Sequence, residues 1–253
     1  MRAGWDPRQL FLLGLIIFVL PNLLSEGHRW PSTEAIIVML LSGIIAITVH
    51  EFMHAWSAHM LGDDTALSMN RVNLNPMNHF DPLGFFGFVL ISLGFTSIAW
   101  GKPVPVNFNR LRGDFRQRKI ASLIIAGCAP LSNVAMAAAA TGLLTVLDSP
   151  GTDLGLTGFF LARFAWLNML LAAFNLIPLP PLDGYRMLSA LLPNFWFPTM
   201  AKLEQFGLFL PFLIIFIDDR LDLGIYGELI GPGLDGLIRL FVNDAFGAYF
   251  YRF

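Results

Sequence analysis

Long apolar stretches, separated by short polar segments, dominate the sequence. The longer stretches approach or exceed the length that an α-helix needs to cross the hydrocarbon core of a bilayer, which is about 20 residues. The pattern predicts an all-α polytopic membrane protein with about five to six transmembrane helices. The predicted spans are residues 10–24, 33–61, 121–146 and 156–177, and a shorter one at 206–217.

The first apolar stretch also allows a second interpretation. Arg2 and Arg8 precede it, as basic residues precede the apolar core of a signal peptide. No small-residue cleavage pattern follows Leu24, and the next apolar stretch begins shortly afterwards. A first transmembrane helix at residues 8–24 is therefore the favoured interpretation.

Three segments do not fit simple helices. Residues 66–82 alternate around 68–74 and then become rich in turn formers, which predicts a short strand followed by a loop. Residues 84–100 are apolar but contain three glycines, so they either cross the membrane or re-enter it. Residues 102–107 contain two prolines, which disfavour helix in the residues before them and predict an extended segment.

Composition supports an integral membrane protein. Hydrophobic residues make up 55% of the chain and charged residues 13%, with a mean hydropathy of +0.63. The net charge of −2 gives no sign of nucleic-acid binding, and the single Cys128 excludes an intrachain disulfide. We expect one membrane-embedded domain over residues 1–253, with a core at 33–184 and a C-terminal helix and interfacial segment at 200–253.

The most specific motif is His50-Glu51-Phe52-Met53-His54, inside the second apolar stretch. On a helix, residues four apart differ by about 40° in direction, so both imidazoles can bind one Zn²⁺. Glu51 then lies where it can take a proton from a zinc-bound water, as in a metalloprotease. Chance is the alternative, but two histidines and a glutamate at membrane depth are costly unless they bind something.

A third metal ligand is expected because catalytic zinc usually keeps three protein ligands and one open position. Asp183 is the outstanding candidate. It follows an apolar segment that prolines 178, 180 and 181 interrupt, and a broken helix at membrane depth is tolerated where it is buried in protein or lines a wet cavity. The alternative is a loop aspartate that caps the helix starting near Tyr185.

Together these motifs carry a family resemblance. The pentad, joined to the segment NLIPLPPLDG at residues 175–184, resembles the site-2 protease family of intramembrane zinc metalloproteases. The similarity extends through segments near residues 74–82, 101–107 and 127–133. It implies that His50, His54 and Asp183 bind zinc, that Glu51 activates water, and that the partner is a transmembrane protein substrate cut within the lipid bilayer. The chain resembles a minimal member without an inserted peptide-binding domain.

Three further residues are candidates for substrate binding. Asn133 and Asn175 are expected to contact the substrate backbone, with hydrogen bonding between helices as the alternative. His79 is a candidate substrate contact or extra metal ligand, with a solvated loop histidine as the alternative. His59, about 140° around the helix from His54, is expected to point away from the metal.

Topology follows from the requirement that the pentad and Asp183 meet at one depth. Their helices must run parallel, so an odd number of crossings separates them, and residues 84–100 should re-enter or lie at the surface. Residues 101–120 contain six Lys or Arg and one Asp, which places this loop in the cytoplasm by the positive-inside rule. We expect a multi-pass protein of the plasma membrane with its active site toward the cytoplasmic face.

A non-catalytic zinc-binding membrane protein or metal carrier is the alternative function. It predicts that Glu51 matters no more than its neighbours, because this glutamate is not needed as a ligand. A carrier would also have more ionisable residues along its spans than the sequence contains. For a protease, residues 68–74 are the expected edge strand for an extended substrate. The sequence predicts neither the substrate's identity nor the oligomeric state.

Overall fold

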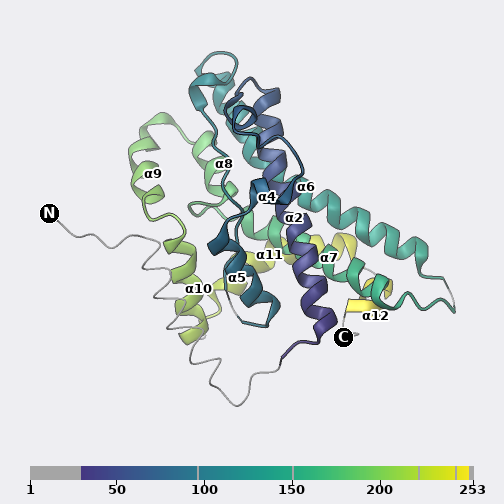
Figure 1. The fold of residues 1–253 in the computed structure, drawn as a ribbon. Coiled ribbons are helices and arrows are strands. Elements are labelled where there is room, and N and C mark those ends of the chain that lie inside the picture. Colours follow the sequence, from purple (N-terminus) through teal and green to yellow (C-terminus); the bar gives the residue numbers. More distant parts are fainter. Residues whose placement is uncertain (1–29, 96, 150, 222, 243, 251–253) are drawn as a thin grey trace.

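The computed structural model describes residues 30–250 except for residues 96, 150, 222 and 243. The described residues form helices and irregular segments without any strand (Figure 1). Three helices are long and apolar enough to span a membrane: α2 (Thr33–Met60), α6 (Phe115–Leu147) and α7 (Gly155–Asn175). The all-α membrane fold is thus confirmed, whereas the predicted helix at residues 8–24 lies outside the described residues.

Shorter helices complete the fold. The remaining α-helices are α3 (Thr65–Ser68), α4 (Pro76–His79), α5 (Pro82–Ser92), α8 (Asp183–Leu191), α9 (Phe197–Glu204), α10 (Phe209–Leu221), α11 (Ile225–Phe241) and α12 (Asp244–Phe250), with single 3₁₀ turns at Phe108–Arg110 and Asn194–Trp196. The predicted fifth span corresponds to α10, whose 13 residues are short for a full crossing.

Side-chain caps define where the first two long helices begin. The Ser32 side chain accepts a hydrogen bond from the Ala35 backbone N–H at the start of α2. Asp114 and Gln117 form a reciprocal capping box at the start of α6, which satisfies two backbone donors that would otherwise lack partners. As a result α6 begins six residues before the predicted span and carries its basic first turns beyond the apolar part.

The strand predicted at residues 68–74 is wrong. This segment forms the end of α3, a turn at Asn70 with a φ of 54°, and an irregular stretch. Asparagine side chains explain the difference. Asn73 Nδ2 donates to the Asn70 carbonyl, and Asn75 Oδ1 accepts from the Met77 backbone N–H. Such local bonds give the backbone an alternative to sheet pairing, so the alternating pattern alone misled the prediction.

The segment at residues 84–100 doubles back, as the re-entrant interpretation predicted. After α5 the chain turns at Gly94 and returns along its own helix. A Cβ at Gly84 would lie 2.1 Å from the Trp100 carbonyl oxygen, and one at Gly87 would lie 2.0 Å from that of Ile98. Only glycine therefore permits the returning segment to lie this close to α5. At 11 residues, α5 is too short to cross a bilayer.

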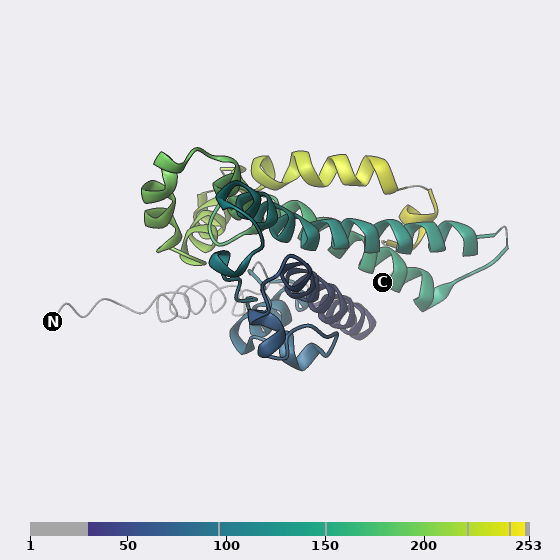
Figure 2. The same ribbon diagram turned by 90° about the horizontal axis from the view of Figure 1, so that it is seen from above.

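The C-terminal helices pack against the long helices. Figure 2 shows α6 and α7 side by side, with α11 running along them. Tyr249 in α12 is only 4% exposed, and its hydroxyl donates to Asp148 Oδ1 at 3.2 Å. Tyr249 thus belongs to a core cluster that includes Met169 and Leu144, while the interfacial position expected for the C-terminal segment stays a prediction.

Candidate metal centre

Two histidines from one face of α2 begin the site. His50 and His54 are one helical turn apart, and their ring centroids lie 5.0 Å from each other. Both side chains are buried, with 8% and 3% of their surface exposed. The spacing of four residues thus produces the shared direction that the sequence predicted.

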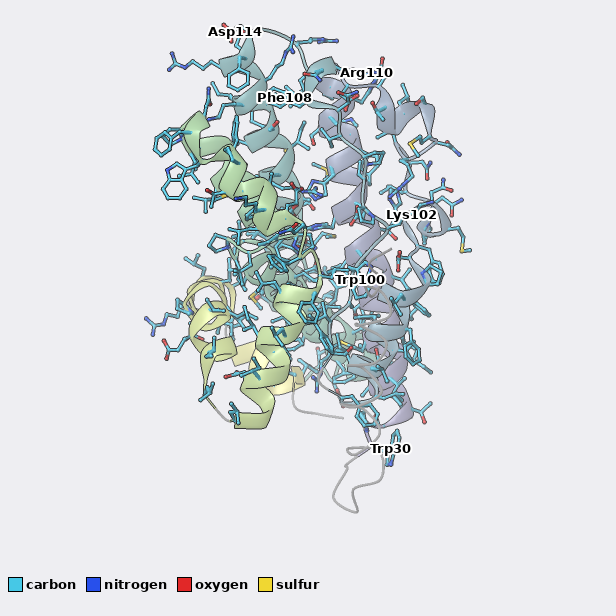
Figure 3. The ribbon with its side chains drawn as sticks, turned by 90° about the vertical axis from the view of Figure 1, so that its left-hand side faces the viewer. Trp30, Trp100, Lys102, Phe108, Arg110 and Asp114 are labelled. Atoms are coloured by element: carbon cyan, nitrogen blue, oxygen red, sulfur yellow. The ribbon has the colours of Figure 1, made fainter. Side chains whose placement is uncertain are left out.

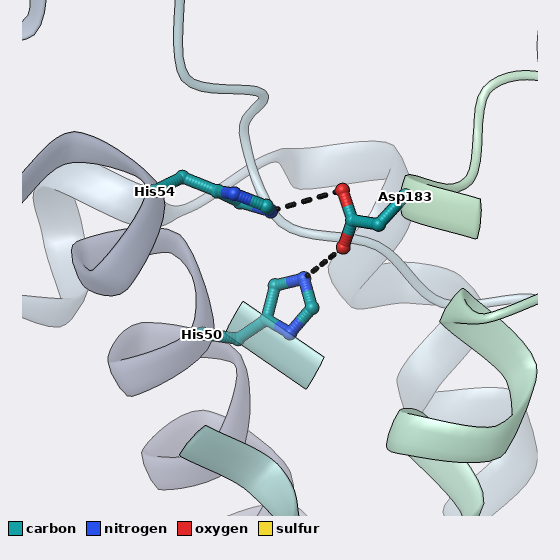
Figure 4. A group of neighbouring side chains, drawn as sticks. All are labelled: His50, His54 and Asp183. Atoms are coloured by element: carbon teal, nitrogen blue, oxygen red, sulfur yellow. Dashed lines mark ion pairs between the residues drawn. The ribbon is translucent and has the colours of Figure 1, made fainter. Parts of the chain in front are cut away.

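Asp183 completes the group from the other side (Figure 4). It is the first residue of α8, directly after the irregular segment that follows α7. Its carboxylate oxygens lie 3.2 Å from His50 Nε2 and 3.1 Å from His54 Nε2. One donor atom from each residue lies within 4.8 Å of the others, so the three can surround a single ion.

Gly184 explains how Asp183 reaches this position. A Cβ on Gly184 would lie 2.1 Å from the Leu176 carbonyl oxygen, which no side chain can tolerate. The chain between Leu176 and Asp183 therefore folds back tightly on the end of α7. Among the described helices long enough to span a membrane, α6 alone lies between α2 and α7, in agreement with the predicted odd number of crossings between those two helices.

Hydrogen bonds from α6 fix both imidazole rings. His54 Nδ1 lies 3.0 Å from the Ile125 carbonyl oxygen, and His50 Nδ1 lies 2.7 Å from Asn133 Oδ1. A carbonyl oxygen can only accept, so His54 Nδ1 carries a proton, and in the neutral ring the Nε2 lone pair points toward Asp183. Lone pairs facing a carboxylate repel it unless a cation lies between them. The donor set therefore fits Zn²⁺.

Glu51 lies beside this group and lines the same cavity. Its side chain is 8% exposed, and Oε2 is buried with no hydrogen-bond partner among the described residues. Glu51 lines the same cavity of about 110 Å³ as His50, His54 and Asp183. A Cβ at Gly101 would lie 2.7 Å from Glu51 Cγ, so the returning chain presses directly against this glutamate.

Two buried charges that the sequence analysis missed hold the extended segment at residues 102–107. Arg71 is 3% exposed, and its guanidinium donates to the backbone carbonyls of Lys102 and Pro103. Asp63, fully buried, accepts from the Asn107 backbone N–H at 2.5 Å. The segment is thus fastened at both ends as it rises from Trp100 past Lys102 to Phe108 (Figure 3). Neither residue belongs to a recognisable motif, so only their burial reveals them.

The remaining predicted residues divide into four cases. Asn133 is fully buried and makes the interhelical hydrogen bonds that the alternative predicted, to His50 and Asn168, while its substrate contact stays a prediction. Asn175 lines the cavity and donates to the Leu171 carbonyl, which leaves its substrate contact a prediction.

His79 lies outside the metal group, with Nε2 2.7 Å from the Asn73 carbonyl oxygen. His59 points away as predicted, with Nδ1 2.6 Å from Asp64 Oδ1.

Comparisons with known proteins agree with this arrangement. The model of peptidase family M50 matches residues 115–217. "Putative zinc metalloprotease YwhC" of Bacillus subtilis is 35% identical over 80% of this chain and 90% of its own length. "Putative zinc metalloprotease Rip2" is 25% identical in Mycolicibacterium smegmatis and 26% identical in Mycobacterium tuberculosis H37Rv. These two alignments cover 86% and 89% of this chain, and 82% and 86% of the relatives. No solved structure matches significantly.

Extensive similarity to these relatives, the family-model match and the buried histidine and aspartate donors lead to one assignment. The chain belongs to peptidase family M50, the site-2 protease family, and is a zinc metalloprotease of the membrane.

Proposed function

We propose that this protein hydrolyses a peptide bond within or near a transmembrane segment of another membrane protein. The observation that carries the proposal is the position of the Glu51 carboxylate, which lines the same buried cavity as the three converging metal donors and whose Oε2 has no hydrogen-bond partner in the described part of the chain. His50 and His54 come from a helix apolar enough to span a membrane. A hydrolytic site at this depth suits a substrate that is itself embedded in the lipid bilayer.

His50, His54 and Asp183 would hold the zinc ion. When bound, zinc supplies a Lewis acid that polarises the scissile carbonyl and makes a water more acidic. Glu51 accepts at Oε2 the proton that the attacking water loses. The C–O bond forms as this water attacks the carbonyl carbon. Glu51 then passes the proton to the amide nitrogen, which leaves as the amine when the C–N bond breaks.

The substrate helix must unwind before it is cut. Its backbone carbonyls are held in intrahelical hydrogen bonds and are not accessible to a nucleophile. The cavity is lined partly by the non-helical residues Trp100, Gly101 and Pro103 and partly by Pro181 and Leu182, which follow α7. Non-helical backbone on two sides of the cavity gives an unwound segment room that packed helices would not.

The proposal also covers the position of the metal site relative to the two faces of the membrane. The basic residues between Gly101 and Ile120 support a cytoplasmic position for that end of α6 by the positive-inside rule. His54 and Asp183 lie toward this end, since His54 contacts Ile125 early in α6. We therefore place the site toward the cytoplasmic face of a plasma membrane.

The test compares zinc content and cleavage for the intact protein and Glu51→Gln in liposomes that contain a single-span model substrate. Both forms should retain zinc, and Glu51→Gln should cleave about 100-fold to 10,000-fold more slowly, the range for loss of a general base. Glu34→Gln, an exposed change at the start of the same helix, is the matched control and should cleave normally.

Two results would contradict the proposal. Normal cleavage by Glu51→Gln would remove Glu51 from the chemistry. Zinc binding by the intact protein without cleavage of a panel of single-span substrates would favour the non-catalytic metal-binding alternative.

A further inference from the structure

A second cavity adjoins the candidate active site. Its volume is about 330 Å³, compared with about 110 Å³ for the cavity that Glu51 lines. Val104 and Arg186 line both cavities, so the second continues from the first. We propose that it is a substrate subsite, which receives the polar chain next to the cleaved bond and selects an acidic side chain there. This inference rests on the proposed function.

The position of the cavity identifies which part of a substrate could enter it. Lys119 and Ser122, from the first turns of α6, form one wall. These turns follow the exposed Arg116 and therefore belong to the polar end of the helix. A substrate chain that leaves the metal centre through this cavity moves from apolar depth toward water. Its occupant is accordingly the juxtamembrane segment of the substrate.

Charge favours an acidic occupant. Lys119 and Arg186 contribute two cations to the lining, against the single anion of Glu204. Lys119 Nζ is already engaged, because it donates to the Leu192 carbonyl and lies 5.3 Å from the Phe197 ring centroid. The exposed Arg186 guanidinium has no hydrogen bond or ion pair with any other described residue. It is therefore free to bind a carboxylate, for which its planar fork is well suited.

The distance along α8 links this selection to the cleaved bond. Arg186 is three residues after Asp183, and residues three apart on a helix are neighbours on its surface. A substrate carboxylate bound by Arg186 is thus within a few residues of the bond held at the metal centre. Val104 and Val106, which also line the cavity, belong to the segment that Arg71 and Asp63 fasten, so this part of the lining is fixed in place.

The experiment uses the intact protein in liposomes with single-span peptides that carry Glu, Gln or Lys at successive juxtamembrane positions. At one position or more, kcat/KM should be about fivefold or more higher for Glu than for Gln, the scale of a partly exposed ion pair. Arg186→Glu should reverse the order and favour Lys. Arg116→Glu removes an equal charge from an exposed position outside the lining and should leave the Glu preference unchanged.

A second readout separates this inference from the proposed function. The affinity of the same peptides for the Glu51→Gln protein can be measured without any cleavage. A Glu preference in binding that Arg186→Glu reverses would support the subsite even if no peptide were cut. Cleavage with equal kcat/KM for Glu, Gln and Lys at every position, or a Glu preference that Arg186→Glu leaves intact, would overturn it.

Discussion

His50 and Asn133 are joined by a buried contact in which Nδ1 of the ring lies 2.7 Å from the amide oxygen. The Asn133 amide nitrogen in turn donates to Asn168 Oδ1 at 2.8 Å, and Asn168 Nδ2 donates to the Phe164 carbonyl. This series of hydrogen bonds connects α2, α6 and α7, and it ends on α7, the helix that leads to Asp183. The orientation of one metal ligand is therefore determined by the helix that positions another.

Removing either asparagine should weaken zinc binding. Asn133→Ala leaves the His50 ring without its partner, and we expect a loss of about 10-fold to 100-fold in zinc affinity, as for other groups that orient metal-bound histidines. Asn168→Ala should have a smaller effect, because it acts through Asn133. Zinc competition with a fluorescent chelator measures both.

The double variant provides the control for this prediction. Once Asn133 is alanine, replacing Asn168 should change zinc affinity little further, since the two residues act in one chain. Additive losses would show that the two residues act independently. Unchanged zinc affinity with impaired cleavage would show that Asn133 serves the substrate directly.

Gly101→Ala should abolish most cleavage while zinc remains bound. The new Cβ would lie 2.9 Å from Glu51 Oε1 and 2.8 Å from Ile47 Cγ2, so the carboxylate must move. A displacement of about 1 Å can cost about 100-fold in rate. Cleavage and zinc content should be measured together. Gly142→Ala, where no atom lies within 4 Å, is the matched control, and equal activities of the two variants would be incompatible with this account.

Gly43→Ala should loosen the contact between α2 and α5. Its Cβ would lie 1.9 Å from Phe88 Cζ, and such overpacking costs about 1–3 kcal/mol. Phe88→Leu makes room, so the double variant should lose less stability than the sum of the single variants. Thermal unfolding in detergent gives the comparison, with Gly127→Ala as a control that meets only Met187 Cε at 3.7 Å. If the stability losses of Gly43→Ala and Phe88→Leu were strictly additive in the double variant, the contact between Gly43 and Phe88 would not account for the loss.

His79 should make stability depend on pH. Burial lowers the pKa of His79 below its ordinary value of 6.5, and the Arg71 charge lowers it further, although the hydrogen bond with Asn73 and the Glu51 charge oppose this. At a pH between the pKa of His79 in the native protein and its higher pKa in the unfolded chain, the unfolded chain binds more protons than the native protein. The stabilisation is thus fully present above about pH 6.5 and is lost as the pH falls toward the native pKa.

Thermal unfolding across pH 5 to 8, taken as roughly the range around an ordinary histidine pKa, tests this dependence. His79→Gln should flatten the acid side of the profile. Met77→Gln changes an exposed residue of the same helix and should leave it unaltered. An identical acid slope in His79→Gln would exclude His79 as its source.

The parts of this protein that could be predicted from its sequence are those determined by local spacing. Apolar length identified α2, α6 and α7, and the four-residue spacing of His50 and His54 determined their shared direction. Asp183 was found because prolines and an apolar segment precede it. Arg71 and Asp63 escaped notice because their roles depend on backbone groups 31 to 44 residues away. The alternating pattern at residues 68–74 failed since asparagine side chains satisfied its backbone locally.

The fastening of residues 102–107 by Arg71 and Asp63 has a consequence for which proteins can be cut. A wall held at both ends cannot adapt its shape to the transmembrane helix proposed as substrate, so the substrate helix itself must unwind. Turnover should then follow how readily a target's helix frays near its polar end. Substrates with glycine, proline or asparagine near that end should be cleaved faster. Substrates with the same charges but a more stable helix should be cleaved slowly.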